Sequence, residues 1–143
     1  MRHNPVDEGR HTALRRLRRA QLAEARRIRR AAAVYRLTPA HLAAPCRISP
    51  LAEARQVAMY LIRTRLTWPS LSRDAPFPSA RIGALLGHRD HSTALHGVAA
   101  IAARLASGQQ EDAYLCHMVR TLGGMLDATH EGADHAHAGG RAA

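Results

Sequence analysis

The sequence predicts an all-α protein of a single domain-sized unit. Alanine, leucine and arginine, which all favour helices, dominate its 143 residues. With one Trp, three Tyr and one Phe, the chain is too poor in aromatic residues for a typical β-sandwich. Apolar residues recur at intervals of three and four along several stretches, which is the helical period, and no pair of segments reads as paired strands.

The first helical stretch is strongly basic and covers residues 12–36 without a glycine or proline. Residues 1–36 hold 11 Arg against three acidic residues, whereas residues 106–143 hold two Arg against five acidic residues. We predict a disordered segment over 1–11, a basic amphipathic helix over 12–30 and a disordered tail over 123–143. The apolar stripe of the basic helix comprises Leu14, Leu17, Gln21, Ala25, Ile28, Ala32 and Tyr35.

The remaining elements follow from capping and turn signals. A helix is expected over about 51–66, and residues 67–78, with three prolines, read as a loop. Ser79 is the expected cap of a short helix that ends at Gly87, and Asp90 is the expected cap of the next. That next helix is expected to bury Leu95, Val98, Ala102 and Leu105, and a last helix begins near Glu111.

Net charge indicates the class of partner. The chain carries +10, and all 21 basic residues are Arg. A small protein of this charge usually meets a polyanion, either nucleic acid or a membrane surface. No apolar run is long enough to span a membrane, and Cys46 and Cys116 form no CxxC motif. We expect a cytoplasmic protein that requires no metal and no cofactor.

Residues 79–105 fit a helix-turn-helix, with two helices joined by the short turn GHRD. Such a unit places the first residues of its second helix against base edges in the major groove. Here those residues are Asp90, His91, Ser92 and Thr93. An Asp can accept from cytosine N4, hydroxyl groups can donate or accept, and a Thr methyl can touch the thymine methyl.

The segment GHRDHSTALHG (87–97) resembles the signature of the DnaA C-terminal domain, whose usual form reads GGRDHTTVLH. ARQVAM (54–59) resembles the RQMAM segment of that family, AAAVYRLTPAHLA (31–43) its first helix and MVRTL (118–122) its last. The resemblance covers 31–122 and implies a helical, Trp-repressor-like domain that binds double-stranded DNA at an AT-rich box of nine base pairs. Control of replication initiation or of transcription, within the bacterial nucleoid, is the function it implies.

Carried over by position, the resemblance implies a role for individual residues. Asp90, His91, Ser92 and Thr93 would read bases in the major groove, and Arg47 would enter the minor groove. The expected contacts to the DNA backbone are Arg55, Gln56, Arg63, Ser79 and Arg89.

The sequence also departs from the family pattern. Ser92 stands where the family usually has Thr. Three positions that are commonly basic in the family are here Pro45, Cys46 and Glu53. The loop before Ser79 is about five residues longer than in the family. No G-x-x-x-x-G-K-[ST] motif occurs, so we expect no ATPase and no other enzyme activity.

Two other readings stay open. The fold could serve as a protein interaction module, or the arginines could drive nonspecific binding to the nucleoid or to RNA. The basic helix could contact phosphates, form a homodimer through its stripe or lie on anionic lipid. His88, His91 and His96 lack the spacing of a metal site.

Overall fold

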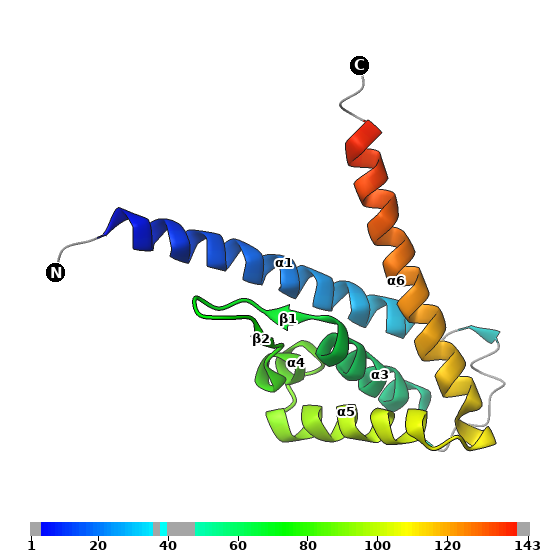
Figure 1. Ribbon diagram of the computed structural model, residues 1–143. Helices are drawn as coiled ribbons and strands as arrows, with labels where there is room; N and C mark the ends of the chain where they lie inside the picture. The colour runs from blue at the N-terminus through cyan, green and yellow to red at the C-terminus, as the bar shows by residue number, and fades with distance from the viewer. Residues whose placement is uncertain (1–3, 36–37, 40–47, 140–143) are drawn as a thin grey trace.

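A computed structural model describes residues 4–35, 38–39 and 48–139 of the chain and confirms the all-α class. Its helices and strands are shown in Figure 1. They are α1 (Pro5–Tyr35), α3 (Pro50–Arg65), β1 (Thr67–Trp68), β2 (Ala75–Pro76), α4 (Ser79–Leu85), α5 (His91–Ala106), the short 3-10 helix η1 (Gln110–Asp112) and α6 (Ala113–Gly139).

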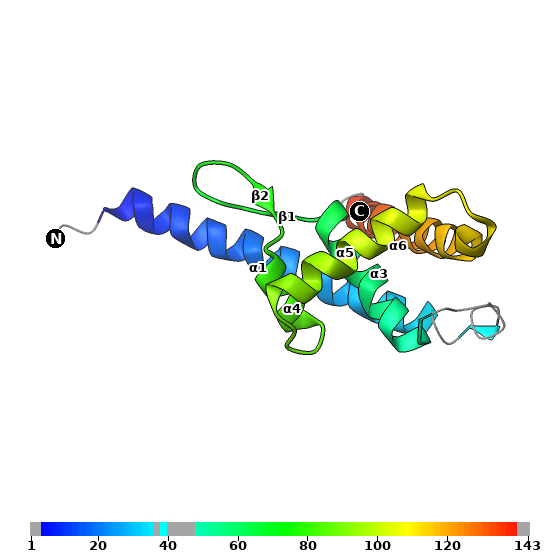
Figure 2. The same ribbon diagram turned by 90° about the horizontal axis from the view of Figure 1, so that it is seen from below.

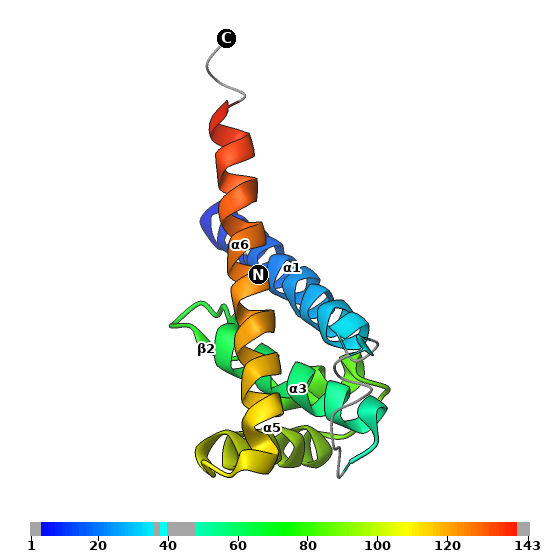
Figure 3. The ribbon, with the colours of Figure 1, turned by 90° about the vertical axis from the view of Figure 1, so that its right-hand side faces the viewer.

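Helix α3 is the centre of the fold, with α1 packed on one side and α5 on the other (Figure 1). Helix α6 starts beside the end of α5 and runs past α3 and α1, as Figure 3 shows. The core between these helices is aliphatic, because each contributes one apolar stripe. Its fully buried members include Ile28, Val57, Ile62, Ile101 and Leu122.

A small strand pair, which the sequence did not predict, interrupts the loop between α3 and α4. Strands β1 and β2 are antiparallel, with Thr67 opposite Pro76 and Trp68 opposite Ala75. The ring of Trp68 meets that of Phe77 edge to face at 5.3 Å, and both rings are buried. Burial of these two aromatic residues fixes the hairpin, which is too short to show strand alternation in the sequence.

Helix α1 is longer than predicted and belongs to the same core as α3. It begins at Pro5, so residues 5–11 are helical, where disorder was expected. Pro5 suits a first helical position, and Asp7 and Glu8 suit the positive end of the helix dipole. Since Ala25 and Ile28 are buried, the domain does not begin at residue 31. At the other end α6 continues to Gly139, so the predicted disordered tail over 123–143 is also helical through that residue.

Three arginines of α1 hydrogen-bond backbone carbonyls elsewhere in the fold. Arg18 Nε donates to the carbonyl of Pro69 at 2.9 Å, and Arg27 to that of Leu126 at 3.1 Å. Arg29 donates to the carbonyl of Leu85 at 2.8 Å. Leu85 is the last residue of α4, and the carbonyl of a last residue has no N–H partner within its own helix. Arg29 therefore caps the C-terminal end of α4, the first helix of the helix-turn-helix.

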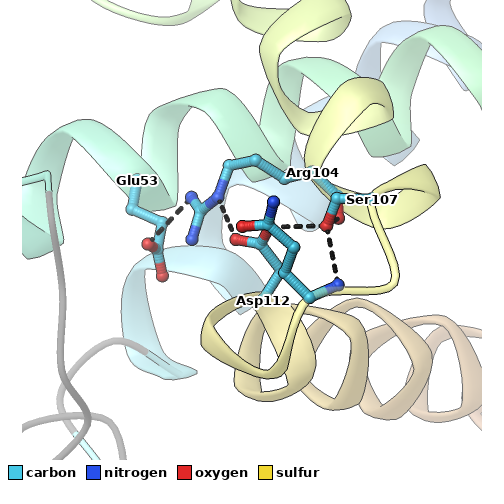
Figure 4. A network of polar contacts seen from close by, with 5 residues as sticks. Glu53, Arg104, Ser107 and Asp112 are labelled. Atoms are coloured by element: carbon cyan, nitrogen blue, oxygen red, sulfur yellow. Dashed lines mark hydrogen bonds and ion pairs between the residues drawn. The ribbon is translucent and has the colours of Figure 1, made fainter.

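A partly buried ion-pair network joins α3, α5 and η1 (Figure 4). Arg104 donates to Glu53 at 3.2 Å and to Asp112 at 2.9 Å, and Ser107 Oγ donates to Asp112 at 2.7 Å. Burial alone would lower the pKa of Arg104, but the hydrogen bonds to Asp112 and Glu53 outweigh it and raise the pKa. Glu53, noted above as an acidic departure from a basic family position, is therefore part of the core, with 2% of its surface exposed.

Candidate nucleic-acid interface

The turn between α4 and α5 has a fixed backbone. Gly87 (φ 91°) and His88 (φ 55°) both adopt the left-handed conformation, which ends α4 where the sequence predicted a glycine stop. The Arg89 N–H donates to the Gly83 carbonyl at 2.8 Å and folds the turn back onto α4. A side chain at Gly83 would collide with the Arg89 carbonyl oxygen, so this close approach requires glycine.

Asp90 caps α5, as the sequence predicted. Its carboxylate accepts a hydrogen bond from the backbone N–H of Thr93 at 2.8 Å. This hydrogen bond holds the pKa of Asp90 below its ordinary value, so the side chain is an anion at neutral pH. Ser79, in contrast, is not a cap: it is the first residue of α4, the capping position is Pro78, and no side chain caps that end. Proline replaces the side-chain cap by presetting the backbone angle.

The first turn of α5 projects its side chains into solvent. His91, Ser92 and Thr93 are all exposed, beside the exposed Arg89 and Asp90 of the turn. The structure thus brings four of the five predicted base-contacting residues to one helix end. The fifth, Arg47, lies outside the described residues.

The buried face of α5 differs from the predicted one. Ala94, Gly97 and Ile101 are buried, whereas Leu95 is 45% exposed and Ala102 is exposed. Leu95 therefore lies on the solvent side of α5, with the residues predicted to contact bases. The sequence analysis placed Leu95 in the core because it assigned the larger apolar side chains to the buried face. The signal that could have found it is the run of small residues at spacings of three and four, which allows helices to pack closely.

Helix α5 lies across α3 (Figure 2), and the two helices are in close contact at Gly97. A Cβ at this position would lie 2.5 Å from Met59 Sδ and 3.5 Å from Gln56 Cγ. Gln56, a predicted backbone contact, is therefore half-buried under α5, and its Oε1 is buried without a hydrogen-bond partner among the described residues. The absence of a side chain at Gly97 lets the second helix of the unit lie directly on α3.

The other residues predicted to contact the DNA backbone lie in different settings. Arg89 is exposed on the turn, and Arg55 borders a hollow next to Gly87. Arg63 donates to the Phe77 carbonyl at 2.6 Å, so its guanidinium supports the segment that leads into α4. Ser79 is half-buried at the start of that helix.

The described part of the chain shows neither a metal centre nor a membrane span. Within it, no three His, Cys, Asp or Glu side chains are grouped as metal ligands would be. No described helix is long and apolar enough to cross a bilayer.

Comparison with known proteins decides the family. The model of the bacterial DnaA protein helix-turn-helix matches residues 25–101, which is more than half of the chain. The chain belongs to the bacterial DnaA helix-turn-helix family. The matched region begins inside α1, in agreement with the burial of Ala25 and Ile28, and contains α3, α4 and most of α5. The DnaA helix-turn-helix is a DNA-binding domain.

A curated relative shares this region. The chain is 40% identical over 76 residues to the chromosomal replication initiator protein DnaA of Thermomicrobium roseum. The aligned segment is 53% of this chain but only 14% of that relative, so the chain spans a small part of the relative's length. No solved structure matches the chain significantly.

Proposed function

We propose that this protein binds double-stranded DNA sequence-specifically, at AT-rich boxes of the DnaA type. The observation that carries the proposal is the start of α5, where the exposed Asp90, His91, Ser92 and Thr93 extend from a rigid, capped helix end. Side chains on the first turn of a second helix are those that meet base edges in the major groove. Leu95 extends the same surface with an apolar group suited to a thymine methyl.

The fixed turn supports this function because base reading needs side chains in defined places. The hydrogen bond from Arg89 to Gly83 and the close packing at Gly97 leave the two helices little freedom to shift. Arg89 on the turn and Arg55 at the hollow next to Gly87 are the proposed partners of phosphates, with Arg47 proposed for the minor groove. Phosphate contacts orient the protein, and base contacts select the sequence.

In the cell, we propose that occupancy of such boxes in the nucleoid controls replication initiation or transcription. The relative from Thermomicrobium roseum is named a chromosomal replication initiator, which makes origin-like DNA the first target to test.

The test is a titration of the full chain against a short box duplex and a scrambled duplex of equal length and composition. We expect the box to bind at least about tenfold more tightly at moderate salt. A ratio near one would indicate nonspecific binding through the arginines. Absence of binding to both duplexes would favour a protein interaction module.

A further inference from the structure

Seven of the nine arginines of α1 fall into two sets that face in different directions, and the exposed Arg10 and Arg16 belong to neither. Arg18, Arg27 and Arg29 point into the fold, where they hydrogen-bond the carbonyls described above. A second set, here called the outer ridge, recurs at spacings of four, seven and four and therefore follows one face of the helix. The outer ridge consists of Arg15, Arg19, Arg26 and Arg30, all exposed.

The outer ridge is a row of positive charges along one face of α1, with a gap of two turns between Arg19 and Arg26. The rise of a helix places Arg15 and Arg30 about 22 Å apart along the axis. Between residues 15 and 30 the one acidic residue is Glu24, which is paired with Arg27 at 2.6 Å. No hydrogen bond or ion pair within the described residues engages the ridge guanidinium groups. Glu8 lies on the same face, two turns before Arg15.

The outer ridge and the start of α5 lie on opposite sides of the protein. Helix α1 uses Ala25, Ile28 and Ala32 to pack on α3, and the ridge is on its other face. Helix α5 packs on the opposite side of α3, as Figures 1 and 3 both show. Two helix–helix contacts separate the axes of α1 and α5 by about 16–20 Å. A straight duplex in contact with His91 and Thr93 therefore cannot also reach the ridge.

We propose that the outer ridge binds a second DNA duplex, so that one chain bridges two duplexes. This inference rests on the proposed function for α5. Along about 22 Å a duplex presents about 13 phosphate charges, so several phosphates are available to each of the four ridge arginines. Guanidinium groups also bind phosphate oxygens through paired hydrogen bonds. The contact involves backbone phosphates alone, so the second duplex can have any sequence.

A lipid surface fits the ridge less well. Helices that lie on membranes insert apolar side chains beside their basic ones. Here the apolar stripe of α1 between residues 21 and 35 is turned into the core, and its central members are fully buried. The ridge thus offers charge without an accompanying apolar face.

The experiment is a capture assay with the full chain. A box duplex is fixed to beads, and a fluorescent scrambled duplex is added in solution. The ridge variant is Arg19→Gln, Arg26→Gln and Arg30→Gln. Its matched control removes three exposed arginines elsewhere, through Arg10→Gln, Arg73→Gln and Arg120→Gln.

We expect wild type and control to capture the second duplex alike. The ridge variant should capture about tenfold less, yet bind the isolated box duplex within about twofold of wild type. Sedimentation should give one chain per two duplexes. Circular dichroism checks that both variants fold; should the triple variant melt early, each single substitution is expected to lower capture about twofold.

Several results would overturn the proposal. They are equal capture by the ridge and control variants, a parallel loss of isolated box binding, or a complex of two chains with two duplexes, which would mean bridging by a dimer. Binding to phosphatidylserine vesicles without capture of a second duplex would assign the ridge to lipid. Ridge-dependent capture with no preference for the box would instead overturn the proposed function and leave the ridge as a DNA surface.

Discussion

Asp90 has a structural role and a proposed reading role, and the two can be separated. Its carboxylate caps α5 through the Thr93 N–H, and the same side chain is exposed at the proposed interface. Asparagine caps helices about as well as aspartate, whereas alanine does not. Loss of box binding in Asp90→Asn would therefore report on DNA contact, and additional loss in Asp90→Ala would report on the cap.

The first prediction concerns base reading by Thr93 and Leu95. Thr93→Ala and Leu95→Ala should each weaken box binding by about 1–3 kcal/mol and change scrambled binding little, because both remove contacts to base edges. Titration of both duplexes measures the effect. Ala99→Ser, on the outer side of α5 further from the turn, is a control expected to bind like wild type. Equal losses on box and scrambled DNA would assign these residues to the backbone.

The second prediction concerns acid stability. The pKa of Asp90 is lowered by the hydrogen bond from Thr93, so the folded protein favours the ionised carboxylate more than the unfolded chain does. The stabilisation is complete above the unfolded pKa of about 3.9 and is lost as the pH falls through the lower folded value. Below about pH 4, the melting temperature of wild type should thus fall relative to that of Asp90→Asn. A constant difference from pH 7 to 3 would contradict this role.

At the scale of elements, the Arg104 network fixes the position of α5 relative to α3 and η1. Arg104→Met removes the guanidinium group that pairs with the buried carboxylate of Glu53. Removing one partner of a buried pair costs about 3–5 kcal/mol, and we expect the lower end because the Arg104 side chain is 23% exposed. Urea unfolding provides the measurement. In the Glu53→Gln background, the cost of Arg104→Met should fall well below this value; an unchanged cost would show that the pair does not interact.

Close packing at Gly97 gives the fourth prediction. Gly97→Ala brings a Cβ against Met59 Sδ, and the flexible Met side chain can relieve part of the overlap. We expect a loss of about 1–3 kcal/mol, as is usual for overpacking. Gly9→Ala is the matched control, because α1 has open space there and alanine favours the helix by about 0.5–1 kcal/mol. If both variants gain stability in urea unfolding, α3 and α5 are not in close contact at Gly97.

At the scale of the whole molecule, α1 is part of the domain from about residue 21 onward. Deletion of 1–16 removes a segment whose described residues, 4–16, are exposed apart from the half-buried Leu14. Deletion of 1–30 also removes the buried Ala25 and Ile28 and the Arg29 cap on α4. We predict that the first truncation melts within a few degrees of wild type and that the second loses cooperative unfolding. Equal melting of both in calorimetry would make α1 an independent appendage.

Helix periodicity made much of this architecture predictable. The stripe of α1 from Gln21 to Tyr35, the span of α3, the glycine stop and the Asp90 cap all follow from local rules that depend on neighbouring residues. Leu17, which was predicted for the same stripe, is instead 55% exposed. The phase of α5 did not follow from such rules, because Ala94 and Gly97 are buried by close approach to α3, a tertiary contact that only the small size and the spacing of these residues indicated. For the same reason Glu53 and Arg63 gave no sign of their partners Arg104 and Phe77, which are distant in sequence.

Arg29 has a further consequence, because it belongs to the same rigid helix as the outer ridge and holds the last carbonyl of α4. We expect a ligand that shifts α1 to change the orientation of the helix-turn-helix through this hydrogen bond. The coupling is reciprocal. If a duplex bound on α1 raises the affinity of α5 for its own duplex by some factor, a duplex bound at α5 raises the affinity of α1 for its duplex by the same factor. The protein would then favour sites where two DNA segments already lie near each other, and its occupancy would depend on DNA folding as well as on sequence.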